Sequence, residues 1–135
     1  MKKITNHRAD GYIDVVVTVL VVSFLLVLTI GVFGAVSRKQ DLKYMCSELV
    51  DLATSTGKVG DEVQARYEML CEETGLYPTV VFHTAYFDED SGKVQLGEVI
   101  SCTLTLESGL PGFGGEFFSF TMTATESGLS GIYWK

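Results

Sequence analysis

The stretch of sequence that decides the fold runs from Val15 to Val36 and reads VVVTVLVVSFLLVLTIGVFGAV. None of its 22 residues is charged. As a helix that rises about 1.5 Å per residue it would extend roughly 33 Å, close to the thickness of a bilayer's hydrocarbon core, which is about 30 Å. Backbone groups in lipid have no water to bind, so we expect one transmembrane helix. A cleaved secretory signal fits less well, because its apolar region usually has about 7–15 residues.

Basic residues lie on both sides of this run, with Lys2, Lys3 and Arg8 before it and Arg38, Lys39 and Lys43 after it. Since the flanks are equally basic, the positive-inside rule gives only a weak preference for one orientation. We expect a single-pass protein of the cell membrane with its C-terminal domain outside. The expected division is a leader or cytoplasmic segment at 1–11, a transmembrane helix at 12–36 and an extracytoplasmic α/β domain at 37–135.

Helical periodicity continues after the apolar run. Apolar residues recur at spacings of three and four, which predicts an amphipathic helix and therefore one long helix from about Tyr12 to Ser55, ending near Gly57. A second helix is expected to open at Asp61 and to end at Gly75. The short connection between the two predicts an antiparallel helical hairpin. The apolar stripe of the first helix consists of Leu42, Met45, Leu49 and Leu52.

Three cysteines occur in the chain, and none of them belongs to a CxxC pair. Cys46 and Cys71 are equally distant from the midpoint of the expected hairpin, so we predict that they lie close together. They are a candidate disulfide if the domain is outside the cell and the separation allows it. Cys102 would then have no cysteine partner within the chain.

Alternating apolar and polar residues predict strands at about Thr79 to Phe87, Lys93 to Leu106 and Glu116 to Glu126. Together with the helices they indicate an α+β fold: a long helix, a hairpin and a small three-stranded antiparallel sheet. One face of the sheet should be apolar and the other rich in threonine. The sequence Glu-Ser-Gly-Leu occurs at 107–110 and again at 126–129, and we interpret both copies as turns. We expect a loop at 111–115.

Composition and spacing argue against several classes of function. The formal net charge of −7 disfavours nucleic acid as a partner. No histidine has a nucleophile or carboxylate placed beside it, so we expect no catalytic residues and no enzyme. The cysteines and histidines lack metal-ligand spacing, and the glycine-rich 111–115 segment lacks the Lys-Ser/Thr pair of a phosphate loop. We therefore expect neither a metal site nor a cofactor.

The chain resembles type IV pilins and pseudopilins, most of all the short TadE-like pseudopilins of tight-adherence systems. The resemblance rests on a short basic leader that ends at Gly11, an acid at Asp14, and an apolar helix that continues as an amphipathic stalk. The whole chain is also similar to an uncharacterised family of bacterial proteins found mainly in Firmicutes. That similarity includes the segment 11–14 and the chain's ending at 127–135.

The resemblance implies a structural subunit that is processed and then assembles through its N-terminal helix into an extracellular type IV or Tad-type filament or a secretion pseudopilus. A prepilin peptidase would cut between Gly11 and Tyr12, and Asp14 would neutralise the new N-terminal amine of a neighbouring copy. The partners would be the lipid bilayer and other pilin-like subunits, of this or a related chain. Small residues at Gly31, Gly34 and Ala35 would allow helices to approach closely. The alternative is a monomeric membrane-anchored binding module that uses the sheet or the glycine-rich loop for recognition.

Overall fold

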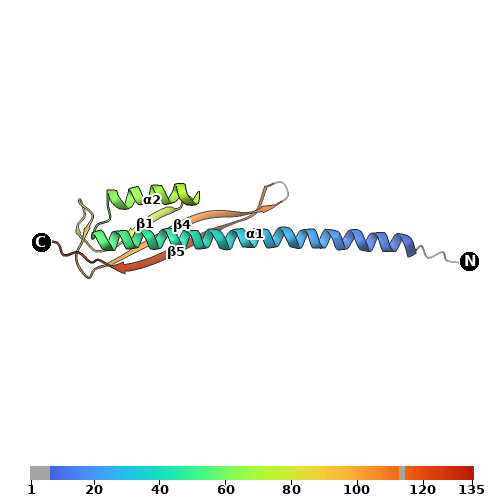
Figure 1. Ribbon diagram of the computed structural model, residues 1–135, viewed down its shortest axis with the longest axis horizontal. Helices are drawn as coiled ribbons and strands as arrows, with labels where there is room; N and C mark the ends of the chain where they lie inside the picture. Colours follow the sequence, from blue (N-terminus) through green and yellow to red (C-terminus); the bar gives the residue numbers. More distant parts are fainter. Residues whose placement is uncertain (1–6, 113–114) are drawn as a thin grey trace, which may run out of the picture. The chain divides into compact units, whose positions relative to one another are not determined.

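The computed structural model describes residues 7–112 and 115–135, and the side chains of residues 11–109 and 118–135. Contacts divide the chain into two units, Met1–Gly34 and Ala35–Lys135. We call the second unit the head. Figure 1 shows the elements in chain order, beginning with helix α1 (His7–Thr56). The fold is α+β, as predicted: a long apolar N-terminal helix, a short second helix and a small antiparallel sheet.

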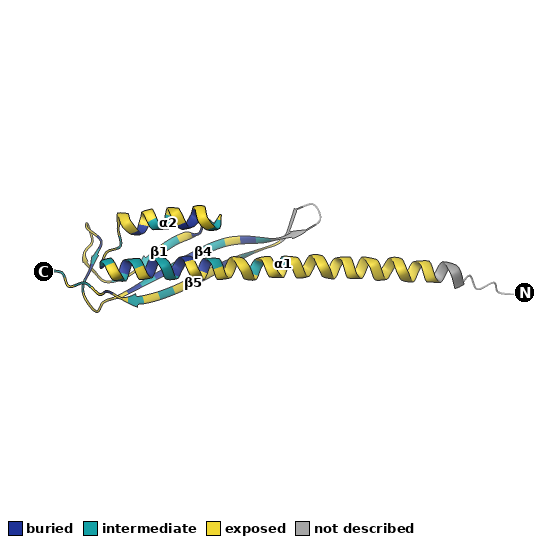
Figure 2. Ribbon diagram, viewed as in Figure 1, coloured by how far each residue is buried: buried dark blue, intermediate teal, exposed yellow. Residues whose placement is uncertain are grey.

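Within the first unit, α1 exposes apolar side chains on every side. From Tyr12 to Phe33 the large apolar residues are 41–78% exposed, and Figure 2 shows this part of the helix as exposed. In the described part of the chain, α1 is the one helix long and apolar enough to cross a membrane. This helix is consistent with a single-pass membrane anchor.

Within the head, the same helix carries a buried stripe. Leu42, Met45 and Leu49 are fully buried and Leu52 is partly buried, so the predicted amphipathic stripe is confirmed. Cys46, Val50 and Ala53 are also buried. These residues belong to one hydrophobic core together with side chains of α2 (Asp61–Thr74) and of the sheet.

Glycines end both helices, as predicted. Helix α1 stops at Thr56, and Gly57 follows with a φ of +64°, in the left-handed region that glycine tolerates best. Helix α2 ends at Gly75, whose φ is +70° and whose N–H donates to the Cys71 carbonyl. An ion pair joins the two helices, with the Arg66 guanidinium 3.0 Å from the Glu48 carboxylate.

The sheet has three antiparallel strands in the order β1-β4-β5, namely β1 (Thr79–His83), β4 (Val99–Gly112) and β5 (Gly115–Leu129). Two further strands, β2 (Tyr86–Asp88) and β3 (Lys93–Val94), pair separately. The predicted strands at Thr79 to Phe87 and Lys93 to Leu106 are therefore each interrupted. The second interruption includes Gly97, whose φ is +82°. At this interruption the chain contacts its C-terminal tail through a hydrogen bond, which the Gly97 N–H donates to the Ser130 carbonyl.

The two Glu-Ser-Gly-Leu segments are strand, not turn, so that prediction was wrong. Residues 107–110 lie within β4 and residues 126–129 lie within β5. Two tertiary contacts explain the error. The Ser108 hydroxyl is buried and accepts a hydrogen bond of 2.7 Å from Arg38 on α1. Gly128 provides a close approach to α1, since an added Cβ would lie 2.9 Å from Cγ2 of Thr54.

The faces of the sheet differ as predicted. Leu104, Met122 and Ala124 point into the core, whereas Thr123 and Thr125 on β5 are exposed. Phe118 is an exception on the apolar side, because its side chain is 69% exposed. Of the expected loop at 111–115, Pro111 and Gly112 end β4 and Gly115 begins β5. Residues 113–114 lie outside the described part of the chain.

Candidate functional site

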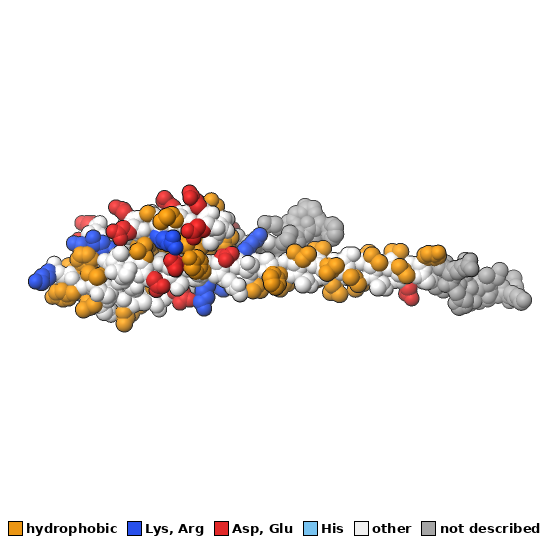
Figure 3. All heavy atoms as spheres, in the orientation of Figure 1, with side chains coloured by type: hydrophobic (Ala, Val, Ile, Leu, Met, Phe, Trp, Pro, Cys, Tyr) orange, Lys and Arg blue, Asp and Glu red, His pale blue; other side chains and the backbone are white. Residues whose placement is uncertain are grey.

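The exposed apolar surface of α1 from Tyr12 to Phe33 is the candidate functional site, and we call it the apolar helix surface. Figure 3 shows the apolar side chains along this part of the helix, while most charged side chains in that view belong to the head. A soluble monomer rarely exposes contiguous apolar area of this kind. Such a surface is suited to lipid or to other apolar helices.

Gly11, Tyr12 and Asp14 lie at the N-terminal end of this surface, all within α1. The Tyr12 side chain is 75% exposed, and Asp14 is also exposed. Among the residues whose side chains are described, no cation forms an ion pair with Asp14. The carboxylate is therefore available to a group outside the described chain.

Gly34 and Ala35 follow Gly31 by three and four residues, so both lie on the same side of α1 as Gly31. Gly31 and Ala35 are half-buried. At Gly34 an added Cβ would meet no atom within 4 Å. The packing of the described chain therefore does not require glycine at position 34.

The thiol of Cys46 makes its hydrogen bonds with the sheet. All three are buried free thiols, so no Cys46–Cys71 disulfide is present. The Cys46 thiol donates to the Cys102 carbonyl at 3.1 Å and to the Ala124 carbonyl at 3.6 Å. The Cys102 thiol is the neighbouring side chain that shifts the pKa of Cys46 most. Equal distance from the hairpin midpoint fixes the level of a residue along a helix, but not the direction in which it points.

Two sequence signals could have identified this thiol pair. Cys46 follows Leu42 by four residues, which places it on the buried side of α1. Cys102 precedes Leu104 by two residues, which places it on the apolar face of its strand. Both thiols therefore point toward the interface between the helix and the sheet.

The environment of the pair shifts both pKa values. The hydrogen bond from Cys102 lowers the pKa of the Cys46 thiol. The same bond, together with burial, raises the pKa of Cys102. On α2, burial and a hydrogen bond with Cys71 raise the pKa of Tyr67 to about 12. The Tyr67 hydroxyl also donates to the Pro78 carbonyl at 2.5 Å.

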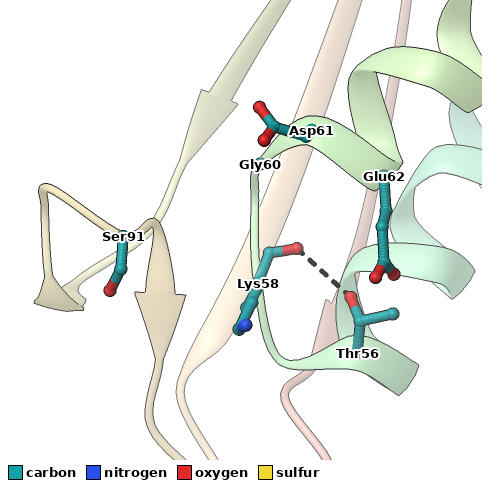
Figure 4. Close-up of a pocket in the computed structure, with 6 residues that line it drawn as sticks. All are labelled: Thr56, Lys58, Gly60, Asp61, Glu62 and Ser91. Atoms are coloured by element: carbon teal, nitrogen blue, oxygen red, sulfur yellow. Dashed lines mark hydrogen bonds between the residues drawn. The ribbon is translucent and has the colours of Figure 1, made fainter.

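A small polar pocket of about 170 Å³ lies beside the loop between α1 and α2 (Figure 4). Its Thr56 hydroxyl donates to the Lys58 carbonyl at 3.3 Å. Two carboxylates, Asp61 and Glu62, occupy the first turn of α2 and already complement the positive end of the helix dipole. The pocket is thus poorly suited to an anion. The lining residues are Thr56, Lys58, Gly60, Asp61, Glu62 and Ser91.

A family model for a domain of unknown function, DUF4320, matches residues 19–135. The chain belongs to the DUF4320 family. The family's description states no activity. No curated protein and no solved structure matches the chain significantly.

The DUF4320 match begins inside the apolar run and continues through the head. The apolar helix is therefore part of what defines a DUF4320 chain, whereas Gly11, Tyr12 and Asp14 lie before the matched residues. Across the described part of this DUF4320 chain, no group of three His, Cys, Asp or Glu side chains could hold a metal ion. Two features of the described chain could support a function. They are the apolar helix surface and the buried pair of thiols, Cys46 and Cys102.

Proposed function

We propose that the chain is a pilin-like structural subunit of a type IV or Tad-type filament or secretion pseudopilus. It assembles through α1 in the cell membrane, with the head outside. One observation carries the proposal. A single 50-residue helix supplies both the apolar helix surface and the buried stripe of the head core. A membrane anchor needs only the apolar helix surface. A filament subunit also needs the same helix to be packed into the core of its head.

Gly34 adds support for helix–helix contact. Glycine within a helix costs about 1 kcal/mol relative to alanine. Since no atom of the described chain lies near an added Cβ at this position, packing within the chain does not offset that cost. Close approach of a neighbouring helix would offset the cost of this glycine, because small residues let helix backbones pack tightly in lipid.

Asp14 has the role of a pairing group in this proposal. A carboxylate at the edge of a membrane span is costly unless it is paired or reaches the interface. Cleavage between Gly11 and Tyr12 by a prepilin peptidase would create an amine at Tyr12. The Asp14 carboxylate of one copy neutralises that amine on the next copy.

Photo-crosslinking in intact cells tests the proposal. A photoreactive residue at Val22 or Leu26 should give crosslinked products that contain two or more copies of the chain, because the helices pack side by side. Asp14→Asn should reduce these products several-fold. Asp51→Asn changes an exposed acid elsewhere on α1 and should leave them unchanged. Crosslinks to lipid alone, or equal yields for both variants, would contradict assembly through Asp14.

A monomeric membrane-anchored binding module is the second candidate. The observation that favours it is the exposed threonine face of the sheet, where the Thr103 and Thr125 hydroxyls lie 3.2 Å apart. In that case the apolar helix surface contacts only lipid, and no photoreactive position in the apolar run gives a product containing two copies.

A further inference from the structure

The buried thiol pair joins two elements that are distant in sequence. Cys46 lies on α1, and Cys102 lies on β4, the central strand of the sheet. Both side chains are fully buried. The sequence-based prediction paired Cys46 with Cys71, whereas all hydrogen bonds of the Cys46 thiol go to β4 and β5.

Small residues allow α1 to approach the sheet closely around these thiols. The Cys46 sulfur reaches the backbone carbonyls of two neighbouring strands. An added Cβ at Gly128 would come within 3.1 Å of the Val50 side chain on the same helix. Ala124 on β5, which pairs with Leu104, is buried and adds little volume to the interface. A cross-link as short as a disulfide needs such a close approach.

We propose that Cys46 and Cys102 form a disulfide that fastens α1 to the central strand when the head folds in the presence of a disulfide oxidant. The inference rests on the proposed function only for the compartment, because an external head meets oxidising conditions. The thiol contact itself does not depend on that function.

The reaction is thiol–disulfide exchange with a small-molecule or protein disulfide as oxidant. The Cys46 thiolate attacks one sulfur of the oxidant and releases one thiol of it, which leaves a mixed disulfide on Cys46. The Cys102 thiolate then attacks the Cys46 sulfur and releases the second thiol. Two protein thiols lose two electrons and two protons, and one oxidant disulfide becomes two thiols. Since both sulfurs are buried in the folded head, the exchange occurs during folding.

Either thiol can be the first nucleophile, because the exchange takes place before the pair is buried and the two sulfurs are then exposed alike. Cys71 faces Tyr67 on its own helix and remains reduced.

The test uses the full chain in detergent, refolded with a mixture of oxidised and reduced glutathione. Free thiols are alkylated under denaturing conditions, and peptides are mapped without reduction. We expect one linked pair of peptides, containing Cys46 and Cys102, and an intact mass lower by two hydrogen atoms. Cys71→Ser is the matched control and should retain the link. Refolding in reductant alone, which keeps the thiols free, should give a head that melts about 10–20 °C lower.

Alkylation of all three cysteines, or a link between Cys46 and Cys71, would overturn the inference. The wild-type chain and Cys71→Ser decide the question by themselves, so a folding failure of Cys46→Ser or Cys102→Ser does not affect the result. Failure of the proposed function is visible separately, as an absence of crosslinks between copies at Val22 and Leu26.

Discussion

Gly128 shows how one residue sets the distance between α1 and the sheet. A side chain here would point at Thr54 and Val50 on the helix, with an added Cβ 2.9 Å and 3.1 Å from their methyl groups. Either the helix or β5 would have to move. The glycine is required by close packing across the core, and not by a turn.

Replacing Gly128 with alanine should destabilise the head by about 1–3 kcal/mol, because overpacking forces shifts in a close-packed core. Thermal unfolding followed by circular dichroism of the full chain in detergent measures the effect. Thr54→Ser removes the nearer methyl group and should recover part of the loss. Gly131→Ala is the control, since its added Cβ would only make ordinary contact with the Thr54 carbonyl at 3.5 Å. Equal melting temperatures for the two alanine variants would show that the close approach is not limiting.

Elements with their own periodicity and end signals are predictable from this sequence, and elements defined by partners are not. Both helices follow their apolar spacing and stop at Gly57 and Gly75 as predicted. Strand β4 was expected to end at Leu106, but it continues to Gly112 because β5 pairs with it along its whole length. Pairing depends on residues elsewhere in the chain, and local turn propensity at Ser108 and Gly109 is too weak to prevent it.

Helix α2 is tied to the segment before β1 by the Tyr67 hydroxyl, which donates to the Pro78 carbonyl. Burial raises the pKa of Tyr67 from 10.0 to about 12, so the folded head holds this proton more tightly than the unfolded chain does. The raised pKa of Tyr67 therefore adds to the free energy of unfolding. This contribution is complete below pH 10 and is lost as the pH rises toward 12.

In Tyr67→Phe, the free energy of unfolding should therefore fall less steeply between pH 10 and pH 12 than in the wild type. Denaturant titrations at several pH values in that interval measure the two slopes. Tyr133→Phe is a suitable control because its ring is 65% exposed. Parallel slopes for wild type and Tyr67→Phe would contradict the assignment.

For the whole molecule, the sequence predicted the α+β architecture and the apolar helix, because hydrophobicity and periodicity determine them directly. The pilin-like role and the roles of Gly11, Tyr12 and Asp14 stay predictions, since they depend on other molecules. The partner of Cys46 could not be derived from hairpin geometry alone. It depends on how α1 is rotated against a sheet whose strands come from much later in the chain.

Processing can be tested on the whole molecule by its intact mass after purification from native membranes. We expect the loss of residues 1–11, with or without one added methyl group on Tyr12. Gly11→Leu should block the cut and retain the full mass. Gly34→Ala lies outside the cleavage site and should be processed normally. A wild-type chain that begins at Met1 or Lys2 would favour the monomeric anchored module.

The attachment of the C-terminal tail gives the head an optical signal of its own. Trp134 is the single tryptophan of the chain. Its indole N–H donates to the Gly57 carbonyl at 3.1 Å, and Lys58 and Lys93 place their ammonium groups about 5 Å from the ring. The tryptophan fluorescence therefore comes from the point where the end of α1, β3 and the tail meet. Detachment of the tail would move the tryptophan emission to longer wavelength, and the apolar part of α1 contributes no tryptophan signal.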